Sequence, residues 1–285
     1  MRPGRARVPE TAYWVDGERA AALPLPDRGL FYGDGLFETL LVVSGRPLLQ
    51  GLHWQRLQRG MARLGFPEHS LPALEAQLLA ACEGSAAEGW HRLRLTVTRG
   101  GGEPGYAPAE PAQLRCIISC QPLARDPRIP LPAAELEVAE LSWGSQPALA
   151  GIKHLNRLEQ VLAAREARER GCDDLVVLGQ GGDVISTTSA NLFLVRDRWL
   201  LTPTLEQAGI AGTRRQLILE ELGEACGLQA EPVALGPADL AAADELFLCN
   251  AVIGLRAVSR LAERRWDDWP VTRQLQAAYA ERLDR

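Results

Sequence analysis

Lysine is almost missing from this chain, although basic residues are not. Lys and Arg together number 31 of the 285 residues, and Lys153 is the only lysine, which leaves 31 − 1 = 30 arginines. A guanidinium stays protonated at any working pH, whereas an amine can deprotonate and attack a carbonyl carbon. Lys153 is therefore a candidate for covalent chemistry. The alternative is that one lysine persists by chance at the edge of a helix.

Other features are also absent, and each absence excludes a class of protein. No apolar run reaches the ~18 residues that a membrane span needs, and residues 1–8 hold three arginines without the apolar core of a secretory signal. The formal net charge of −5 argues against a nucleic-acid binder, because such a protein presents a basic face. The six cysteines form no CxxC pair and the four histidines are dispersed, so we expect no metal site and reduced thiols in the cytoplasm.

The length and the hydrophobic content, 46% of residues, are those of a globular enzyme with one large core or two modest ones. Four prolines lie within Gln121–Pro132, a composition typical of a linker. We therefore expect an α+β chain of two domains. The small N-terminal domain would span 1–122, the proline-rich linker 123–132 and the larger C-terminal domain 133–285.

Local patterns predict secondary structure in both domains. Asp16-Gly17 lies between strand-like flanks and predicts a hairpin. Apolar and polar residues alternate through 93–97, which predicts a half-buried strand. Helices are predicted over His154–Arg170, where Gly171 follows as a terminating glycine, and over Gly212–Leu222.

The segment Gly100–Gly105 matches the spacing GxGxxG, which binds dinucleotides in some proteins. Dinucleotide binding requires a helix directly after the glycines, and the residues that follow include Pro108 and Pro111, which cannot open a helix cleanly. We therefore reject a Rossmann site and expect a mobile glycine loop beside an active site. The motifs GxSxG, HExxH and Walker A do not occur in the sequence.

Several blocks of sequence together resemble the fold-type IV pyridoxal-phosphate enzymes, a family of class IV aminotransferase-like proteins. The blocks are Asp27–Thr39, Thr98–Tyr106, Gly151–Gln160, Ser189–Phe193, Gln207–Gly212 and Cys249–Ala251. The resemblance spans about residues 13–256. It implies the two-domain fold of D-amino-acid aminotransferases, with pyridoxal 5'-phosphate bound between the domains. The block around Lys153 is similar to that of the lyase branch of the family.

The resemblance assigns residues of this chain to the cofactor. It implies that Lys153 forms a Schiff base with the cofactor aldehyde and, once displaced by the substrate, moves a proton. It implies that the Arg56 guanidinium binds the cofactor phosphate, helped by the amides of Gly212 and Thr213 at a helix start. Asn250 is implied as a further phosphate contact. The alternatives are a solvated helix charge for Arg56 and ordinary capping for Thr213 and Asn250.

One position departs from the pattern of the family. The family commonly has a glutamate five residues before the asparagine that corresponds to Asn191, and this glutamate keeps the cofactor ring nitrogen protonated. This chain has Ser186 there, and we expect both Ser186 and Asn191 to contact the cofactor. Because serine offers only a neutral hydrogen bond, we expect a weaker electron sink, which would impair a transaminase more than a lyase whose product becomes aromatic.

The lyase branch implies a substrate with two carboxylates, 4-amino-4-deoxychorismate. The expected reaction exchanges the substrate amine for Lys153 on the cofactor, abstracts a ring proton and eliminates, which gives 4-aminobenzoate and pyruvate for folate biosynthesis. The resemblance implies Arg115, Tyr106 and Arg99 as substrate contacts and Thr39 as the catalytic residue that donates or relays a proton. For Tyr106 and Arg99 the alternative is packing within a loop.

The resemblance also implies a homodimer and functional coupling to an aminodeoxychorismate synthase, with no nucleic-acid or membrane partner. The nearest alternative function is a transaminase of the same fold that acts on D- or branched-chain amino acids. A third hypothesis is a non-catalytic binding protein with a decayed site, which Ser186 in place of glutamate favours slightly.

Overall fold

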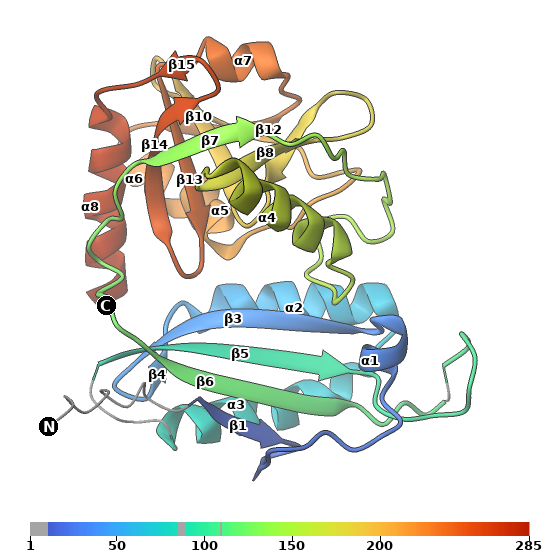
Figure 1. The fold of residues 1–285 in the computed structure, drawn as a ribbon. Coiled ribbons are helices and arrows are strands. Elements are labelled where there is room, and N and C mark those ends of the chain that lie inside the picture. The colour runs from blue at the N-terminus through green and yellow to red at the C-terminus, as the bar shows by residue number, and fades with distance from the viewer. Residues whose placement is uncertain (1–10, 85–88, 109, 285) are drawn as a thin grey trace, which may run out of the picture. The chain divides into compact units, whose positions relative to one another are not determined.

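The computed structural model describes residues 11–84, 89–108 and 110–284 (Figure 1). It divides the chain into two compact units, Met1–Asp126 and Pro127–Arg285. The division falls within 123–132, the proline-rich segment that we interpret as a linker. Among the described residues, no helix combines the length and the apolar character that crossing a membrane requires.

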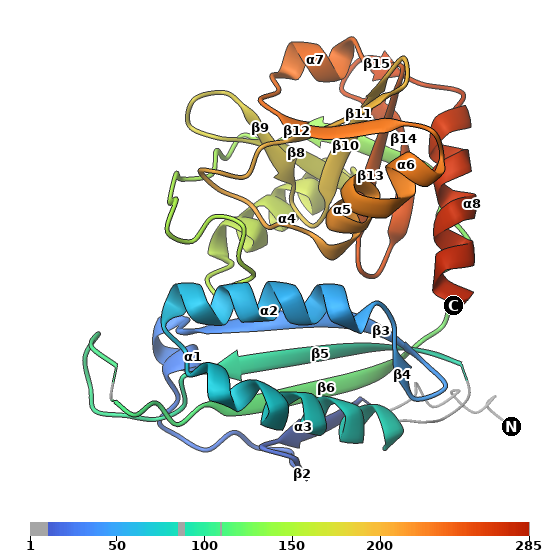
Figure 2. The ribbon, with the colours of Figure 1, turned by 180° about the vertical axis from the view of Figure 1, so that it is seen from behind.

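The first unit is an antiparallel sheet of six strands in the order β2-β1-β6-β5-β3-β4. The strands are β1 (Ala12–Val15), β2 (Glu18–Arg19), β3 (Gly35–Val43), β4 (Arg46–Pro47), β5 (Trp90–Thr98) and β6 (Arg115–Leu123). The helices are α1 (Arg28–Tyr32), α2 (Gln50–Leu64), the 3-10 turn η1 (Glu68–Ser70) and α3 (Leu71–Glu83). Figure 2 shows α2 and α3 in front of the strands and Figure 1 shows them behind, so both helices cover one face.

Sequence patterns of the first unit predict its sheet correctly. The apolar residues of 93–97 are buried while Arg92 and Arg94 are exposed, which confirms a strand with one face on the core. The hairpin at Asp16-Gly17 is also confirmed, because β1 pairs with β2 and both turn residues have positive φ, 51° and 89°. These elements fix the positions of Glu38, Thr39 and the glycine loop in this unit.

The second unit contains a mixed sheet in the order β12-β11-β10-β13-β14-β7-β8-β9, with β15 paired to β14. Its strands are β7 (Ala134–Val138), β8 (Asp174–Leu178), β9 (Val184–Thr187), β10 (Asn191–Arg196), β11 (Trp199–Pro203), β12 (Gln229–Val233), β13 (Glu245–Asn250), β14 (Gly254–Leu261) and β15 (Arg264–Arg265). Its helices are α4 (Leu158–Arg170), α5 (Thr213–Leu217), the π-helical turn η2 (Ile218–Leu222), α6 (Gly223–Ala225), α7 (Pro237–Ala241) and α8 (Pro270–Asp284). Figure 1 shows α4 in front of the strands, and Figure 2 shows α5 and α6 in front.

Two predicted helices of the second unit differ from the structure at one end. The helix α4 begins at Leu158 and not at His154, because Arg157 Nε donates to the His154 carbonyl (2.8 Å) and holds the preceding residues in a loop. Its end at Gly171, with φ of 68°, is confirmed. The predicted helix Gly212–Leu222 is α-helical only as far as Leu217 and then continues as a π-helical turn.

Candidate active site

Lys153 lies in a loop that is tied to another loop of the second unit. Two backbone hydrogen bonds make the tie: Gly151 N donates to Gly209 O, and Ala211 N donates to Gly151 O, both at 3.0 Å. Gly151 has φ of 81°, a conformation that favours glycine. The segment that ends in Lys153 is therefore held beside the stretch that leads into Gly212 and α5, and the Lys153 side chain is partly buried.

The start of α5 packs closely against Asn191. Asn191 Nδ2 donates to Ile210 O (2.9 Å), and a Cβ added at Gly212 would lie 2.0 Å from Asn191 Oδ1. Glycine is therefore the residue that allows this approach. The first amides of a helix have no acceptor within the helix and carry partial positive charge. The amides that follow Gly212 can accordingly bind an anion such as a phosphate.

A buried arginine supports the start of the same helix. The Arg214 side chain is fully buried, and its Nε donates to Tyr279 Oη on α8 (3.0 Å) while Nη2 donates to Ala251 O (3.3 Å). Arg214 Nη1 donates to Thr213 Oγ1 (3.2 Å). Because this oxygen accepts from Arg214, the proton of the Thr213 hydroxyl points to a different acceptor. The sequence analysis missed Arg214, since nothing in a chain rich in arginine distinguishes it.

The strand β9, the loop that follows it and the end of β13 contribute further polar groups. Ser186 is buried and its hydroxyl donates to Thr187 O (2.8 Å). Thr188 Oγ1 is buried and has no hydrogen-bond partner among the described residues. Asn250 Oδ1 accepts from two backbone amides at 2.8 Å each, and its Nδ2 donates to Ser189 O (3.1 Å), so Asn250 shapes the turn after β13.

These groups of the second unit fit a cofactor that carries an aldehyde and a phosphate. Lys153 supplies the one side-chain amine, and the start of α5 supplies amides for a phosphate. The buried Thr188 hydroxyl can form a hydrogen bond with a further polar atom of the cofactor. The predicted cofactor residues Lys153, Asn191, Gly212 and Thr213 are brought together by the contacts above. Among the described residues, no cluster of three or more His, Cys, Asp or Glu side chains could hold a metal ion.

Arg56, the predicted phosphate ligand of the first unit, belongs to a buried charged triad. Arg56 Nε donates to Glu38 Oε1 (2.8 Å), Nη2 donates to Oε2 (2.5 Å), and His53 Nδ1 lies 2.7 Å from Oε2. Burial alone would raise the pKa of Glu38, but the Arg56 and His53 side chains outweigh it and lower that pKa to about 2. The ionised carboxylate thus fixes the guanidinium plane of Arg56. Sequence patterns did not predict this triad.

Arg99 and Arg115 are predicted to bind the substrate. In the structure, the guanidinium groups of both residues donate hydrogen bonds to other groups of the first unit. Arg99 Nε donates to Asp34 Oδ2 (2.9 Å), and Nη2 donates to Leu64 O (2.7 Å). Arg115 Nη1 donates to Pro24 O (2.8 Å) and lies 3.5 Å from the buried Asp27 carboxylate. These contacts stabilise loops of the first unit, which agrees with the alternative that Arg99 packs within a loop. Binding of substrate by Arg99 or Arg115 stays a prediction.

Tyr106 lies at the glycine loop, which the first unit holds through its backbone. Arg28 donates to Gly105 O (2.9 Å) and to Tyr106 O (2.7 Å), and Gly105 N donates to the Tyr32 hydroxyl (3.1 Å). The Tyr106 ring packs at 5.7 Å from that of Tyr32 but remains 89% exposed. The loop is thus anchored by its main chain while the Tyr106 side chain stays available to a ligand.

Thr39 lies on the face of the sheet that α2 and α3 leave uncovered. Its neighbour Glu38 faces α2, and successive strand residues point to opposite faces. Thr39 pairs across β3 and β5 with Arg94, whose guanidinium lies 3.8 Å from the ring centroid of Phe37. The Arg94 side chain is exposed at one side, but partial desolvation of the guanidinium by the surrounding protein, followed by repulsion from the neighbouring Arg92, lowers the pKa of Arg94. Arg94 is a cation beside Thr39 that sequence analysis did not single out.

Comparisons with known proteins agree with this arrangement. The model of the family described as amino-transferase class IV matches residues 35–261. The chain belongs to the class IV aminotransferase family. A relative named aminodeoxychorismate lyase, from Vibrio harveyi, is 34% identical over 274 residues, which cover 93% of this chain and 98% of that protein.

Solved structures of class IV aminotransferase proteins share the fold. The crystal structure of 4-amino-4-deoxychorismate lyase from Pseudomonas aeruginosa is 41% identical, with a TM-score of 0.87, and covers 95% of this chain and 99% of that one. A hypothetical aminotransferase from Mycobacterium tuberculosis in a PLP-bound form is 24% identical, with a TM-score of 0.79 and coverage of 96% and 97%. The expected α+β fold of fold-type IV enzymes is confirmed, whereas the roles of individual site residues stay predictions.

Proposed function

We propose that this protein is a pyridoxal-phosphate-dependent lyase that converts 4-amino-4-deoxychorismate to 4-aminobenzoate and pyruvate. The observation that carries the proposal is the placement of Lys153, the only lysine, on a loop hydrogen-bonded to the stretch that opens α5. The two lyases reported above support this substrate, because they match nearly the whole chain at 34% and 41% identity.

The cofactor supplies an aldehyde that takes up an amine and a ring that withdraws electrons from the adjacent carbon. Lys153 would hold the cofactor, and the amides at Gly212 and Thr213, the Thr213 hydroxyl, Asn250 and the Arg56 guanidinium would bind its phosphate. Asn191 acts by supporting Ile210 and the approach of Gly212. Ser186 has committed its proton to Thr187 O, so its lone pairs remain for a donor.

Proton movement is the catalytic task of the chain itself. When the substrate amine replaces the Lys153 amine, Lys153 becomes a free base that can remove the ring proton next to nitrogen. Loss of this proton makes the ring aromatic and breaks the ring C–O bond, so that the enolpyruvyl group leaves as enolpyruvate, which becomes pyruvate when its methylene carbon takes up a proton. Thr39 would donate or relay a proton to the leaving group, and Arg115, Arg99 and Tyr106 would bind the substrate carboxylates.

We also propose that the enzyme acts in the cytoplasm as a homodimer, coupled in function to a synthase that supplies its substrate. The helix α4 supports the dimer, because Leu158, Val161 and Leu162 form one apolar face at helical spacing and are 78%, 60% and 45% exposed. The cysteines support a reducing compartment, since none of the six forms a disulfide among the described residues.

A coupled assay tests the proposed reaction. An aminodeoxychorismate synthase generates the substrate in place, and release of 4-aminobenzoate and of pyruvate is measured in equal amounts. The same protein is incubated with D-alanine or leucine and 2-oxoglutarate, which are substrates for the transaminase alternative. Keto-acid exchange faster than 4-aminobenzoate release would overturn the lyase in favour of the transaminase.

Reductive trapping tests the role of Lys153. Borohydride treatment of the reconstituted protein should bleach its visible absorbance and fix the cofactor on Lys153, because no other side chain offers an amine. Trypsin then cleaves only after arginine, so the adduct should appear on the peptide Ile129–Arg157. The variant Lys153→Ala should carry no covalent adduct after the same treatment, because a reduced cofactor that is not joined to an amine stays detached from the chain. A colourless protein, or an adduct on another peptide, would support a non-catalytic binding protein instead.

A further inference from the structure

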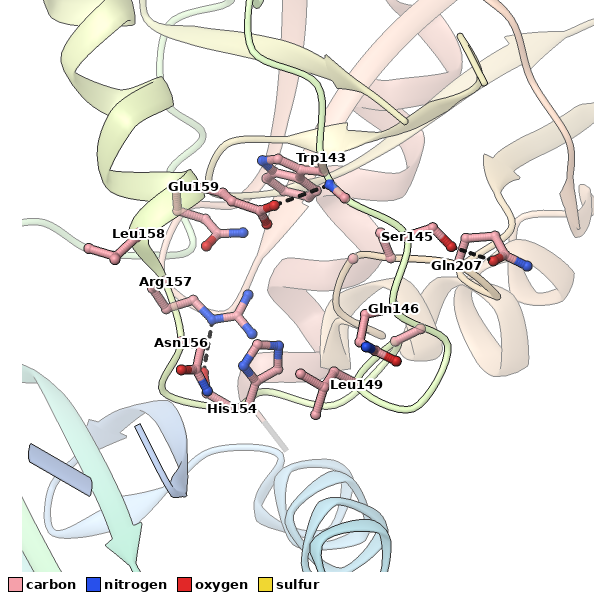
Figure 3. Close-up of a pocket in the computed structure, with 15 residues that line it drawn as sticks. Trp143, Ser145, Gln146, Leu149, His154, Asn156, Arg157, Leu158, Glu159 and Gln207 are labelled. Carbon is pink, nitrogen blue, oxygen red and sulfur yellow. Dashed lines mark hydrogen bonds between the residues drawn. The ribbon is translucent and has the colours of Figure 1, made fainter. Parts of the chain in front are cut away.

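A cavity of about 330 Å³ lies in the second unit beside the Lys153 loop (Figure 3). Its walls come from three segments: residues 143–150, the loop and first turn at 154–160, and residues 207–209. The proposed mechanism uses none of the side chains that line it. The cavity nevertheless adjoins the mechanism in sequence, because His154 follows Lys153 directly.

The walls of this cavity contain four buried polar atoms without a hydrogen-bond partner among the described residues. They are Trp143 Nε1, His154 Nδ1, Arg157 Nη2 and Gln160 Oε1. The Trp143 side chain is only 4% exposed. Buried polar groups in proteins are nearly always hydrogen-bonded, so a group of unpartnered ones around a cavity indicates a bound polar molecule.

The donors among these atoms outnumber the acceptors. Trp143 Nε1 and Arg157 Nη2 can only donate, whereas Gln160 Oε1 can only accept. Burial, helped by the nearby Arg157 charge, lowers the pKa of His154 to about 4, so at neutral pH its ring is uncharged and can donate from one nitrogen. Burial lowers the pKa of Arg157 to about 10, with Glu159 opposing the shift, which leaves Arg157 cationic at neutral pH.

The remaining polar and apolar groups of the wall narrow the choice of ligand. The one carboxylate, on Glu159, accepts from the backbone amide of Gly144 (3.1 Å), and the Ser145 hydroxyl donates to Gln207 Oε1 (2.7 Å). Figure 3 shows the Arg157 guanidinium next to the His154 ring, and the Leu149 side chain lines the same space. The cationic Arg157 and the further donors match an anionic group on the ligand. The single acceptor matches one donor on the ligand, and the apolar and aromatic surface matches an apolar body.

We propose that this cavity is a second binding site for a small aromatic amino-carboxylate. The carboxylate would accept from Arg157 and Trp143, and the aromatic amine would donate to Gln160 Oε1. With the proposed function, on which this part of the inference rests, the product 4-aminobenzoate is such a molecule. Binding of the product beside the Lys153 loop would lower the turnover of the enzyme without competing with its substrate.

Two variants each remove one polar group of the wall while they keep its shape. Trp143→Phe deletes one N–H group, and Gln160→Met replaces an amide by an apolar chain of similar length. Trp269→Phe is the matched control, because Trp269 Nε1 already donates to Val258 O (2.8 Å) and does not line the cavity. None of the three residues belongs to the proposed catalytic or cofactor-binding groups.

The experiment titrates 4-aminobenzoate into the holoenzyme labelled with ¹⁵N-tryptophan, and equilibrium dialysis counts the molecules bound per chain. The Trp143 indole signal, identified by its loss in Trp143→Phe, should shift and saturate. Each cavity variant should weaken binding at this site by about 5- to 10-fold, the loss expected for one hydrogen bond, and Trp269→Phe should not. Benzoate, which lacks the amine, should bind more weakly to wild type than 4-aminobenzoate and should lose nothing further in Gln160→Met.

A Trp143 signal that stays unmoved while the dialysis reaches saturation would overturn the proposal, as would equal affinity in wild type and both cavity variants. If inhibition by 4-aminobenzoate is purely competitive and is unchanged in Trp143→Phe, the inference that product bound in this cavity lowers turnover is wrong. The coupled lyase assay is independent of the titration. If 4-aminobenzoate release fails but the Trp143 signal shifts, the proposed function falls and the binding site stands.

Discussion

At the scale of single residues, two of the proposed phosphate ligands, Thr213 and Arg56, are each held by a buried ionisable partner. Arg214 donates to the hydroxyl of Thr213, and Glu38 accepts from the guanidinium of Arg56. In both pairs the partner restricts which group the ligand can offer: the Thr213 hydroxyl keeps its proton for another acceptor, and the Arg56 guanidinium has a fixed plane. The partners are therefore positioning residues, whose removal should change cofactor affinity even though they need not touch the cofactor.

A double-mutant cycle tests the pair of Arg214 and Thr213. Thr213→Val should weaken pyridoxal-phosphate binding by about 10-fold, the loss of one hydrogen bond to a charged group. Arg214→Met should cause a similar loss, and the double variant should add little, because both changes act on the same hydrogen bond from the Thr213 hydroxyl to the phosphate. Dissociation constants for pyridoxal phosphate and for pyridoxal, which lacks the phosphate, are measured by absorbance. Additive losses, or an equal loss with pyridoxal, would contradict the coupling; Arg282→Met on the surface is the control.

The pKa of Glu38 predicts a pH-dependent part of the stability. Its folded pKa, about 2, is below the ordinary value of 4.5, so its contribution is complete above about pH 4.5 and disappears as the pH falls toward 2. The contribution is on the order of 3 kcal/mol. Glu38→Gln should therefore lower the free energy of unfolding at pH 7 by about that amount and by less at pH 3.

Urea unfolding at the two pH values measures the difference. Glu68→Gln, a change at an exposed carboxylate on the same unit, is the matched control and should not alter the pH dependence. If Glu38→Gln and wild type lose stability in parallel between pH 7 and pH 3, the buried triad does not hold the Glu38 carboxylate ionised.

At the scale of elements, sequence patterns correctly predicted the features that depend on residues close together in the sequence. The Asp16-Gly17 hairpin, the strand at 93–97 and the end of α4 at Gly171 each depend on residues close in sequence. The start of α4 does not, because the Arg157 side chain and the tie between Gly151 and Gly209 hold the residues before it in a loop. Contacts between distant residues, such as Arg99 with Leu64, were likewise beyond any pattern in the sequence.

The start of α5 gives a prediction about one glycine. Gly212→Ala would place a Cβ 2.0 Å from Asn191 Oδ1, so either the helix start or Asn191 must move. The variant should lose about 1 to 3 kcal/mol of stability and bind pyridoxal phosphate at least 10-fold more weakly. Gly51→Ala on α2, where an added Cβ meets nothing within 4 Å, is the control and should not destabilise the fold. Thermal unfolding and cofactor titration measure both, and normal cofactor affinity in Gly212→Ala would show that this approach does not shape the phosphate site.

At the scale of the whole molecule, composition and structure point to Lys153 from independent directions. The scarcity of lysine makes one amine conspicuous in the sequence, and the structure ties the loop of that amine to the start of α5. The buried partners of the site residues, Glu38, His53 and Arg214, could not be predicted in this way. They are ordinary residue types whose role depends on distant contacts: Glu38 with α2, and Arg214 with Tyr279.

The exposed face of α4 predicts the oligomeric state. Leu158, Val161 and Leu162 leave an apolar surface that a second copy of the chain would cover, since isolated patches of this kind favour association. Placing a charge in this face, as in Leu162→Glu, should shift the protein toward monomer by at least 10-fold in dissociation constant, because the charge would be buried without a partner. Sedimentation equilibrium over a range of concentrations measures the shift. Leu79→Glu, at an exposed leucine of α3 in the first unit, is the matched control. If both variants dissociate alike, or if wild type is monomeric throughout, α4 is not the dimer interface.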